Sequence, residues 1–181
     1  VIEEKGIYSI EKFIIARRLM YWQVYLHKTV LSAENMLIQI LNRAKYLYKN
    51  SKKIYLSPDL KRFFENSFSI DEFTKDNTIL DNFSRLDDYE IYASLKYWIK
   101  NKDFVLSNLS QKILDREILK IRIQKIKFNK KTISEYRLNM MKKENINLNE
   151  SKYFIFSDKV SNSLYSIHES NIKILFKDGN I

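Results

Sequence analysis

The chain has 181 residues, a formal net charge of +10, no cysteine, one proline, two glycines and two histidines. Without cysteine it can hold no disulfide, no thiolate nucleophile, and no cysteine-ligated zinc or iron–sulfur site. Two glycines are too few for a glycine-rich phosphate-binding loop. The histidines, His27 and His168, leave most histidine-based metal sites without ligands. The hydrophobic fraction of 45% is typical of a folded chain with one domain or slightly more.

Both ends of the sequence favour a piece of a longer chain. It starts at Val1 rather than at a methionine, and its last residues include Asp178-Gly179, a turn signal without a return strand. No leader peptide is visible. No apolar run reaches the ~20 residues that a membrane-crossing helix needs. We therefore expect a cytosolic protein without a membrane segment.

The positive charge is concentrated in the second half of the sequence. Residues 1–90 hold 14 basic and 13 acidic side chains, whereas residues 91–181 hold 18 and 9. The segment 119–143 alone carries nine basic residues against Glu135. Such a field attracts phosphate-rich ligands or nucleic acid. The preference for Lys over Arg favours a solvated surface instead, and charge alone leaves both interpretations open.

Helices are predicted for the first two thirds of the chain. Apolar residues with a 3.6-residue period indicate a long helix from Ser9 to about Tyr48, with Ser9 as its N-cap and a break near residues 29–32. Proline, serine and aspartate start signals then predict shorter helices. These cover Pro58–Glu65, Ile70–Lys75 (with Ser69 and Glu72 as a capping box), Asn77–Arg85, Asp87–Lys100 and Asp103 to about Asp115.

The sequence of the last third predicts a mixture of strands and helix. Apolar residues alternate over Ile118–Lys127, which indicates a strand, and a helix is expected over Thr132–Lys143. Tyr153–Phe156 and Ile172–Phe176 are short β-rich runs, and a third strand fits Ser163–Ile167. The expected fold is therefore mainly α: a helical region over 1–116, followed by a small α+β subdomain over 117–181.

One face of the long helix carries a row of side chains that could bind a ligand. Phe13, Arg17, Tyr21 and Tyr25 follow one another at i+4 spacing, with Lys28 close to the same row. An arginine on an apolar row must reach solvent, pair with a carboxylate or meet an anionic ligand. Tyrosines at helical spacing are more often core residues than ligand contacts, so the spacing alone leaves both roles open.

Several runs of the sequence resemble the HD-domain phosphohydrolases related to deoxynucleoside triphosphate triphosphohydrolases. The most specific run is Gly6–Thr29, GIYSIEKFIIARRLMYWQVYLHKT. Weaker similarities to the later helices and the small C-terminal subdomain of that family follow at Leu86–Ile91, Lys96–Trp98, Leu106–Leu119, Val160–Tyr165 and Ile172–Gly179. The resemblance implies the helical bundle portion of an HD-domain phosphohydrolase, and a function in hydrolysing deoxynucleoside triphosphates to deoxynucleoside and triphosphate.

The resemblance also implies roles for particular residues. Arg17 would contact the substrate triphosphate, while Tyr21 and Tyr25 would face its sugar and phosphates. His27 and Lys28 would lie near an interface of a homo-oligomer, where regulated members bind an activating nucleotide. Some relatives carry histidine at the place of Tyr21, so the resemblance implies no direct proton-transfer role for this tyrosine.

The metal motif of that family is missing from the sequence. It consists of a histidine, a His-Asp dipeptide and a later aspartate, and no His-Asp occurs here. The divalent metal ion is therefore expected in a parent enzyme, with ligands outside this chain, and the chain alone is expected to be inactive. Two alternatives stay open: a basic helical module that binds nucleic acid, and a non-catalytic scaffold that assembles through its long helix.

Overall fold

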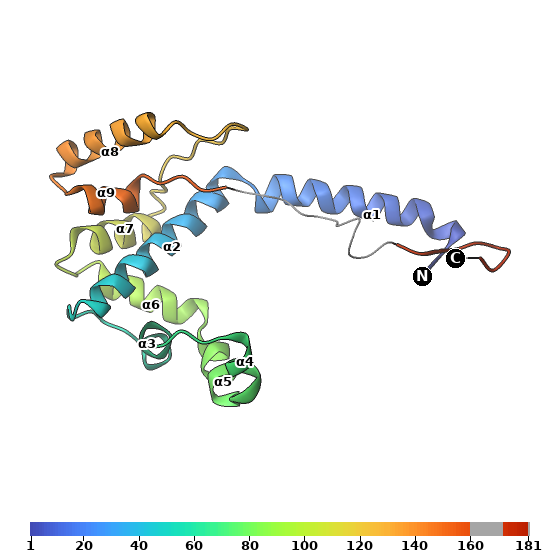
Figure 1. Cartoon of the computed structure of the whole chain (residues 1–181), viewed down its shortest axis with the longest axis horizontal. Helices are drawn as coiled ribbons and strands as arrows, with labels where there is room; N and C mark the ends of the chain where they lie inside the picture. Colours follow the sequence, from blue (N-terminus) through green and yellow to red (C-terminus); the bar gives the residue numbers. More distant parts are fainter. Residues whose placement is uncertain (160–171, 181) are drawn as a thin grey trace. The chain divides into compact units, whose positions relative to one another are not determined.

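The structure is a computed structural model, and it describes residues 1–159 and 172–180. It is mainly helical, as predicted (Figure 1). The elements in chain order are β1 (Ile2–Glu3), the 3-10 turn η1 (Glu4–Gly6), α1 (Ile7–Met20), the π-helical turn η2 (Tyr21–Tyr25), α2 (Lys28–Lys49), α3 (Pro58–Glu65), α4 (Ile70–Lys75), α5 (Asn77–Arg85), α6 (Asp88–Trp98), α7 (Phe104–Leu114), α8 (Lys130–Glu144), α9 (Leu148–Phe154) and β2 (Ile174–Leu175).

The chain forms two compact units. Unit 1 combines Val1–Leu31 with Ser157–Ile181, and unit 2 is the continuous stretch Ser32–Phe156. This division differs from the boundary expected at residue 117, because α8 and α9 belong with the helices before them. Phe154 of α9 packs on Phe104 of α7 with ring centroids 6.1 Å apart.

The core of unit 2 is built on α2. Met36, Ile40, Ala44 and Leu47 follow at helical spacing and are at most 6% exposed, so they form one buried stripe. The same core includes buried residues from α3, α6, α7 and α9: Leu60, Phe64, Leu95, Trp98, Val105, Leu106, Leu109 and Phe154. The indole N–H of Trp98, which is 1% exposed, donates to the carbonyl oxygen of Tyr55 at 2.8 Å, so its only polar group is satisfied.

The predicted start signals of the short helices are confirmed. Ser57 caps α3 with Pro58 in the first turn, and Ser69 and Glu72 form the complete capping box of α4. The backbone amides of Glu90 and Leu106 donate to the side chains of the N-cap residues Asp87 and Asp103. Each cap satisfies an amide that no carbonyl of its own helix can reach.

Two strands predicted in the last third are wrong. Residues 115–129 form no regular element, because Leu119 turns its backbone toward α2. Its N–H donates to Sδ of Met36 at 3.2 Å, and its carbonyl accepts from Oγ of Ser32 at 2.6 Å. Tyr153 and Phe154 end a helix, since the capping box of Asn147 and Glu150 starts α9 just before them.

The remaining predictions for this part of the chain have mixed outcomes. The helix over 132–143 is confirmed as α8. The strand expected over 172–176 is limited to β2, which pairs in parallel with β1 through Ile2–Ile174 and Glu3–Leu175. The third strand expected at 163–167 lies outside the described residues.

The long N-terminal helix is interrupted earlier than predicted. It starts at Ile7 after the turn at Gly6, so Ser9 lies inside the helix and is not its N-cap. The interruption falls at Leu26 and His27 rather than at residues 29–32, because the π-helical turn η2 ends there and Leu26 leaves helical geometry (φ −96°, ψ 15°). Within the described ranges, no helix combines the length and apolar character that crossing a membrane requires.

Candidate functional site

Arg17, Tyr21 and Tyr25 form one continuous row in unit 1. The guanidinium carbon of Arg17 lies 5.9 Å from the ring centroid of Tyr21, within the range of a cation–π contact. The rings of Tyr21 and Tyr25 are tilted by 50° with centroids 5.0 Å apart. The structure therefore brings together the three residues that the i+4 spacing predicts on one face.

The row crosses a change in helix type that the sequence does not indicate. Tyr21–Tyr25 is a π-helical turn, and the N–H of Leu26 donates to the carbonyl oxygen of Tyr21, five residues earlier, at 2.8 Å. Turns of this kind are rare and occur frequently at functional sites. Both tyrosines of the row lie in this turn.

The side chains of this row could bind an anionic group and pack against a ring of a ligand. Arg17 is exposed, and among the described residues no carboxylate lies within ion-pair distance of its guanidinium. Its planar fork can donate two parallel hydrogen bonds to a phosphate group. Tyr25 is 50% exposed and Tyr21 is half-buried, so both rings offer a face or a hydroxyl group to a ligand. Phe13, one turn before Arg17, is 59% exposed.

His27 and Lys28 do not join this row by any hydrogen bond or ion pair in the described part of the chain. His27 instead precedes α2 and acts as its cap. Its Nδ1 accepts a hydrogen bond from the backbone N–H of Thr29 at 3.3 Å, and its carbonyl accepts from the N–H of Leu31 at 3.0 Å. Helix capping thus accounts for His27 in this structure, and Lys28 is exposed beside it.

Replacing His27 by Ala is expected to weaken the start of α2 by about 0.5–1 kcal/mol, because the amide of Thr29 loses its acceptor. His27→Asp should keep the wild-type stability, since aspartate is a preferred N-cap. Amide hydrogen exchange at Thr29 is the measurement. Exchange that is equally fast in the Ala and Asp variants would contradict the capping role.

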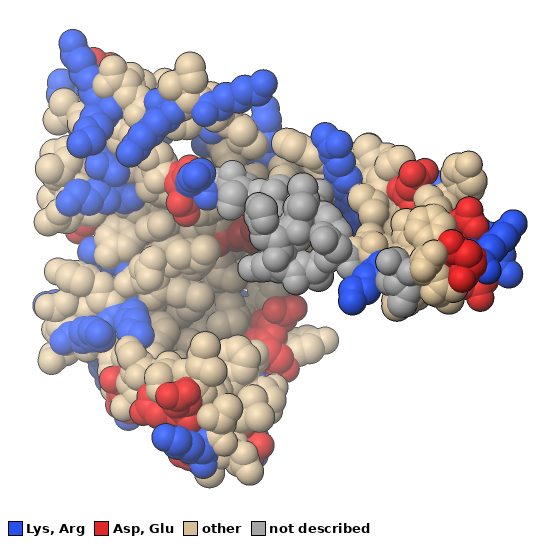
Figure 2. Space-filling model, turned by 45° about the vertical axis from the view of Figure 1, so that its right-hand side comes forward, with Lys and Arg blue, Asp and Glu red and all other residues tan. Residues whose placement is uncertain are grey.

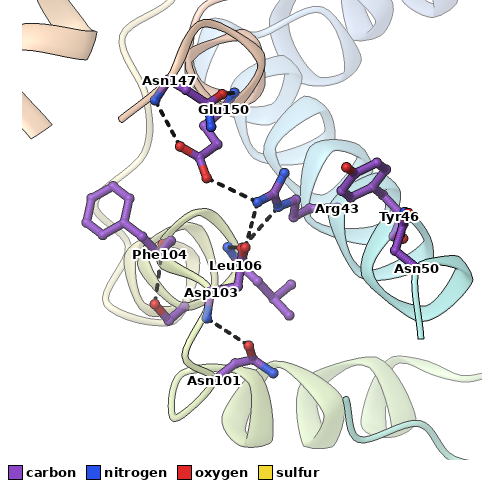
Figure 3. A network of polar contacts seen from close by, with 10 residues as sticks. Arg43, Tyr46, Asn50, Asn101, Asp103, Phe104, Leu106, Asn147 and Glu150 are labelled. Carbon is purple, nitrogen blue, oxygen red and sulfur yellow. Dashed lines mark hydrogen bonds and ion pairs between the residues drawn. The ribbon is translucent and has the colours of Figure 1, made fainter. Parts of the chain in front are cut away.

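A second polar cluster, which sequence reasoning missed, lies at Arg43 of α2. Its Nε and Nη2 donate to the two carboxylate oxygens of Asp103 at 3.0 and 2.6 Å, and Nη2 also reaches Glu150 at 3.4 Å. Figure 3 shows Arg43 pointing between Asp103 at the start of α7 and Glu150 of α9. The rings of Tyr46 and Tyr153 lie within 5.3 Å of the guanidinium carbon. The sequence offered one indication of this cluster: Arg43 stands next to Ala44, on the apolar stripe of α2, where a charged side chain needs a partner.

This cluster is built for stability rather than for binding. Burial lowers the pKa of Arg43, but the hydrogen bond and charge of Asp103 outweigh it and raise the pKa above its usual value. A hollow of about 780 Å³ lies beside it, lined by residues of α2, of α9 and of the turn before α9. Because Nε and Nη2 of Arg43 already donate to Asp103 and Glu150, the guanidinium has no free pair of these donors for a ligand in that hollow.

The basic segment 119–143 lies in unit 2. Eight of its nine basic side chains form no ion pair among the described residues, and Lys143 pairs with Glu144 at 3.3 Å. Figure 2 shows Lys and Arg side chains gathered at the top of the molecule, over α8. The segment also exposes Ile123 and Ile126, at 55% and 81%.

A metal centre is not found in the part of the chain that the structure describes. There, no three His, Cys, Asp or Glu side chains come close enough together to hold a metal ion. The metal ion that the resemblance implies would therefore need ligands other than these described residues.

Two known proteins are similar to the chain, and one of them is a phosphohydrolase. No protein-family model matches the chain. An uncharacterized protein of Bacillus subtilis (strain 168), YwfO, is 31% identical over 130 residues, which are 71% of this chain and 27% of that protein. A crystal structure of a phosphohydrolase from Bacteroides thetaiotaomicron superposes with a TM-score of 0.86 and 40% identity over 99% of this chain and 44% of that one. The chain thus shares, over nearly its whole length, the fold of a phosphohydrolase, and it spans less than half the length of either relative.

Proposed function

We propose that the chain is part of a cytosolic, metal-dependent phosphohydrolase that cleaves deoxynucleoside triphosphates to deoxynucleoside and triphosphate. Its contribution is the row Arg17, Tyr21 and Tyr25, which contacts the substrate phosphates and sugar. The observation that carries the proposal is this continuous row of ring contacts, with an unpaired guanidinium at one end among the described residues. The similarity to a phosphohydrolase supports a hydrolytic role in general.

The chemistry of the row suits a triphosphate substrate. A triphosphate chain presents several anionic oxygens, and an arginine fork donates two hydrogen bonds without ever losing its proton. As water attacks the α-phosphorus, negative charge grows on the α-phosphate oxygens, and a guanidinium stabilises that charge. The bond to the 5′-oxygen breaks, and this oxygen takes up a proton to leave as the deoxynucleoside. Tyr21 and Tyr25, next along the helix and in ring contact with each other, would stack on the sugar or base or donate from their hydroxyl groups.

Water activation is assigned to polypeptide outside this chain. A divalent metal ion lowers the pKa of a bound water and supplies a hydroxide nucleophile near neutral pH. The described residues offer no site for such an ion. Arg17, Tyr21 and Tyr25 would therefore bind and orient the substrate.

The test is a chimera in which this chain replaces the part it matches in the Bacteroides phosphohydrolase. The 40% identity over 99% of the chain makes this exchange practicable. The chimera is incubated with each of the four deoxynucleoside triphosphates and Mg²⁺ or Mn²⁺, and the products are separated by anion exchange. We expect deoxynucleoside and triphosphate, and no turnover after chelation of the metal. Release of single phosphate groups, or no hydrolysis by a folded chimera, would contradict the proposal.

Nucleic-acid binding through the segment 119–143 is the second candidate. The observation that favours it is the group of basic side chains without carboxylate partners among the described residues. Its binding would weaken steeply as the salt concentration rises. The segment presents Tyr136 as its one tyrosine, without a row of aromatic rings for stacking bases, which makes it the weaker candidate.

A further inference from the structure

The helix formed by α1 and η2, Ile7–Tyr25, exposes apolar side chains in every direction. Three consecutive residues, Phe13, Ile14 and Ile15, are 41–59% exposed, and consecutive residues of a helix point about 100° apart. Five more apolar residues of the same helix are 50–59% exposed: Leu19, Met20, Trp22, Val24 and Tyr25. A helix that is apolar all round is typical of the interior of a larger protein.

The described part of unit 1 gives this helix little support. Neither α1 nor η2 contains a buried residue, and Leu31 is the one buried residue in the described part of the unit. Helices in proteins gain most of their stability from packing of their apolar side chains against other elements. Unit 2, by contrast, has a core of twelve buried residues. The helix Ile7–Tyr25 thus needs apolar contacts that its own unit lacks in the described residues.

The relatives provide the candidate for those contacts. More than half of the Bacteroides phosphohydrolase, and more of YwfO, lies outside the part that this chain matches. We propose that the helix Ile7–Tyr25 is a docking surface for this remaining polypeptide, which encloses it as a central helix. This docking does not depend on the identity of the substrate.

Two other occupants fit the side-chain pattern less well. A second copy of the chain, packed helix against helix, would cover one side of each helix and leave the opposite apolar side exposed. A bilayer would meet four charged side chains, Glu11, Lys12, Arg17 and Arg18, within α1. An enclosing protein surface can cover every apolar side and still offer openings or charged partners to these four side chains, and the opening at Arg17 would admit an anion.

The test compares this chain alone with the chimera described above. Trypsin cleaves after Arg17 and Arg18, and Trp22 reports on the same helix by fluorescence, while buried Trp98 serves as an internal reference. We expect at least tenfold slower cleavage at Arg17 and Arg18, and less acrylamide quenching of Trp22, in the chimera. Equal cleavage and quenching in both proteins, or a chimera without a cooperative melting transition, would overturn the inference.

Matched variants locate the contact. Leu19→Glu should destabilise the chimera and leave the isolated chain unchanged, whereas Ile126→Glu, at an even more exposed isoleucine of unit 2, should change neither. Equal effects of both substitutions, or a dimer of the isolated chain that Leu19→Glu dissolves in sedimentation, would contradict docking to the remaining polypeptide. A chimera that covers Trp22 but hydrolyses no nucleotide would support docking and defeat the proposed function.

Discussion

Replacing Arg43 by Ala is expected to lower the free energy of unfolding of the chain by about 3–5 kcal/mol. The substitution leaves the carboxylates of Asp103 and Glu150, 15% and 24% exposed, facing each other without their shared cation. It also removes the contacts of the guanidinium with Tyr46 and Tyr153. Because the three charged residues come from α2, α7 and the α9 region, their loss loosens three helices at once. Urea unfolding followed by circular dichroism measures the effect.

Two further variants separate charge from helix capping at Asp103. The N–H of Leu106 donates to Oδ1 of Asp103 at 2.9 Å, so this carboxylate also caps α7. Asp103→Asn keeps an acceptor for the cap, and Asp103→Ala removes it, so the Ala variant should be less stable by about another 1 kcal/mol. Lys49→Ala, an exposed lysine at the end of α2, is the matched control and should change stability by less than about 0.5 kcal/mol. A cost below about 1 kcal/mol for Arg43→Ala would contradict a buried ion-pair network.

Replacing Arg17 by Ala in the chimera is expected to lower kcat/KM for deoxynucleoside triphosphates by about 10²–10³, the usual loss when one donor to a developing negative charge is removed. Arg17 is exposed and forms no ion pair among the described residues, so its loss should leave the melting temperature of the chimera unchanged. Steady-state kinetics with a single deoxynucleoside triphosphate measure the effect.

Arg18 supplies the matched control for Arg17. It carries the same charge, lies one residue further along α1 and is likewise exposed, but it points about 100° away around the helix. Arg18→Ala should therefore change kcat/KM by less than about threefold, because a charge remote from the substrate is screened by salt. Similar losses of kcat/KM for both substitutions would show that the net charge of α1, and not a direct contact with Arg17, determines substrate binding.

Local signals predicted most of the helices. The Ser69–Glu72 box, Asp87 and Asp103 fix helix starts through hydrogen bonds that span only three residues, and Pro58 favours the first turn through its fixed φ. Such bonds depend on neighbours in the sequence alone. The i+4 spacing of Arg17, Tyr21 and Tyr25 is local in the same sense, and the row appears in the structure although a π-helical turn carries it.

Contacts between distant residues decided the parts that the sequence did not predict. The alternation over 118–127 indicates a strand. The backbone of Leu119 instead forms hydrogen bonds with the side chains of Ser32 and Met36, which lie more than 80 residues earlier. Arg43 meets Asp103 and Glu150 across 60 and 107 positions, and no sequence pattern encodes that meeting. The extent of the apolar surface on α1 is also a property of the folded chain, because it depends on which side chains remain exposed.

Photo-crosslinking with an azido-substituted deoxyadenosine triphosphate tests the proposed substrate row most directly. After irradiation of the folded chimera and digestion with trypsin, the modified peptide is identified by mass spectrometry. The row predicts labelling within Leu19–Lys28, the peptide that contains Tyr21 and Tyr25, with loss of the label when unmodified deoxynucleoside triphosphate or inorganic triphosphate is in excess. Labelling confined to the basic segment 119–143, or labelling of Leu19–Lys28 that excess nucleotide does not reduce, would contradict the assignment of Arg17, Tyr21 and Tyr25 to the substrate site.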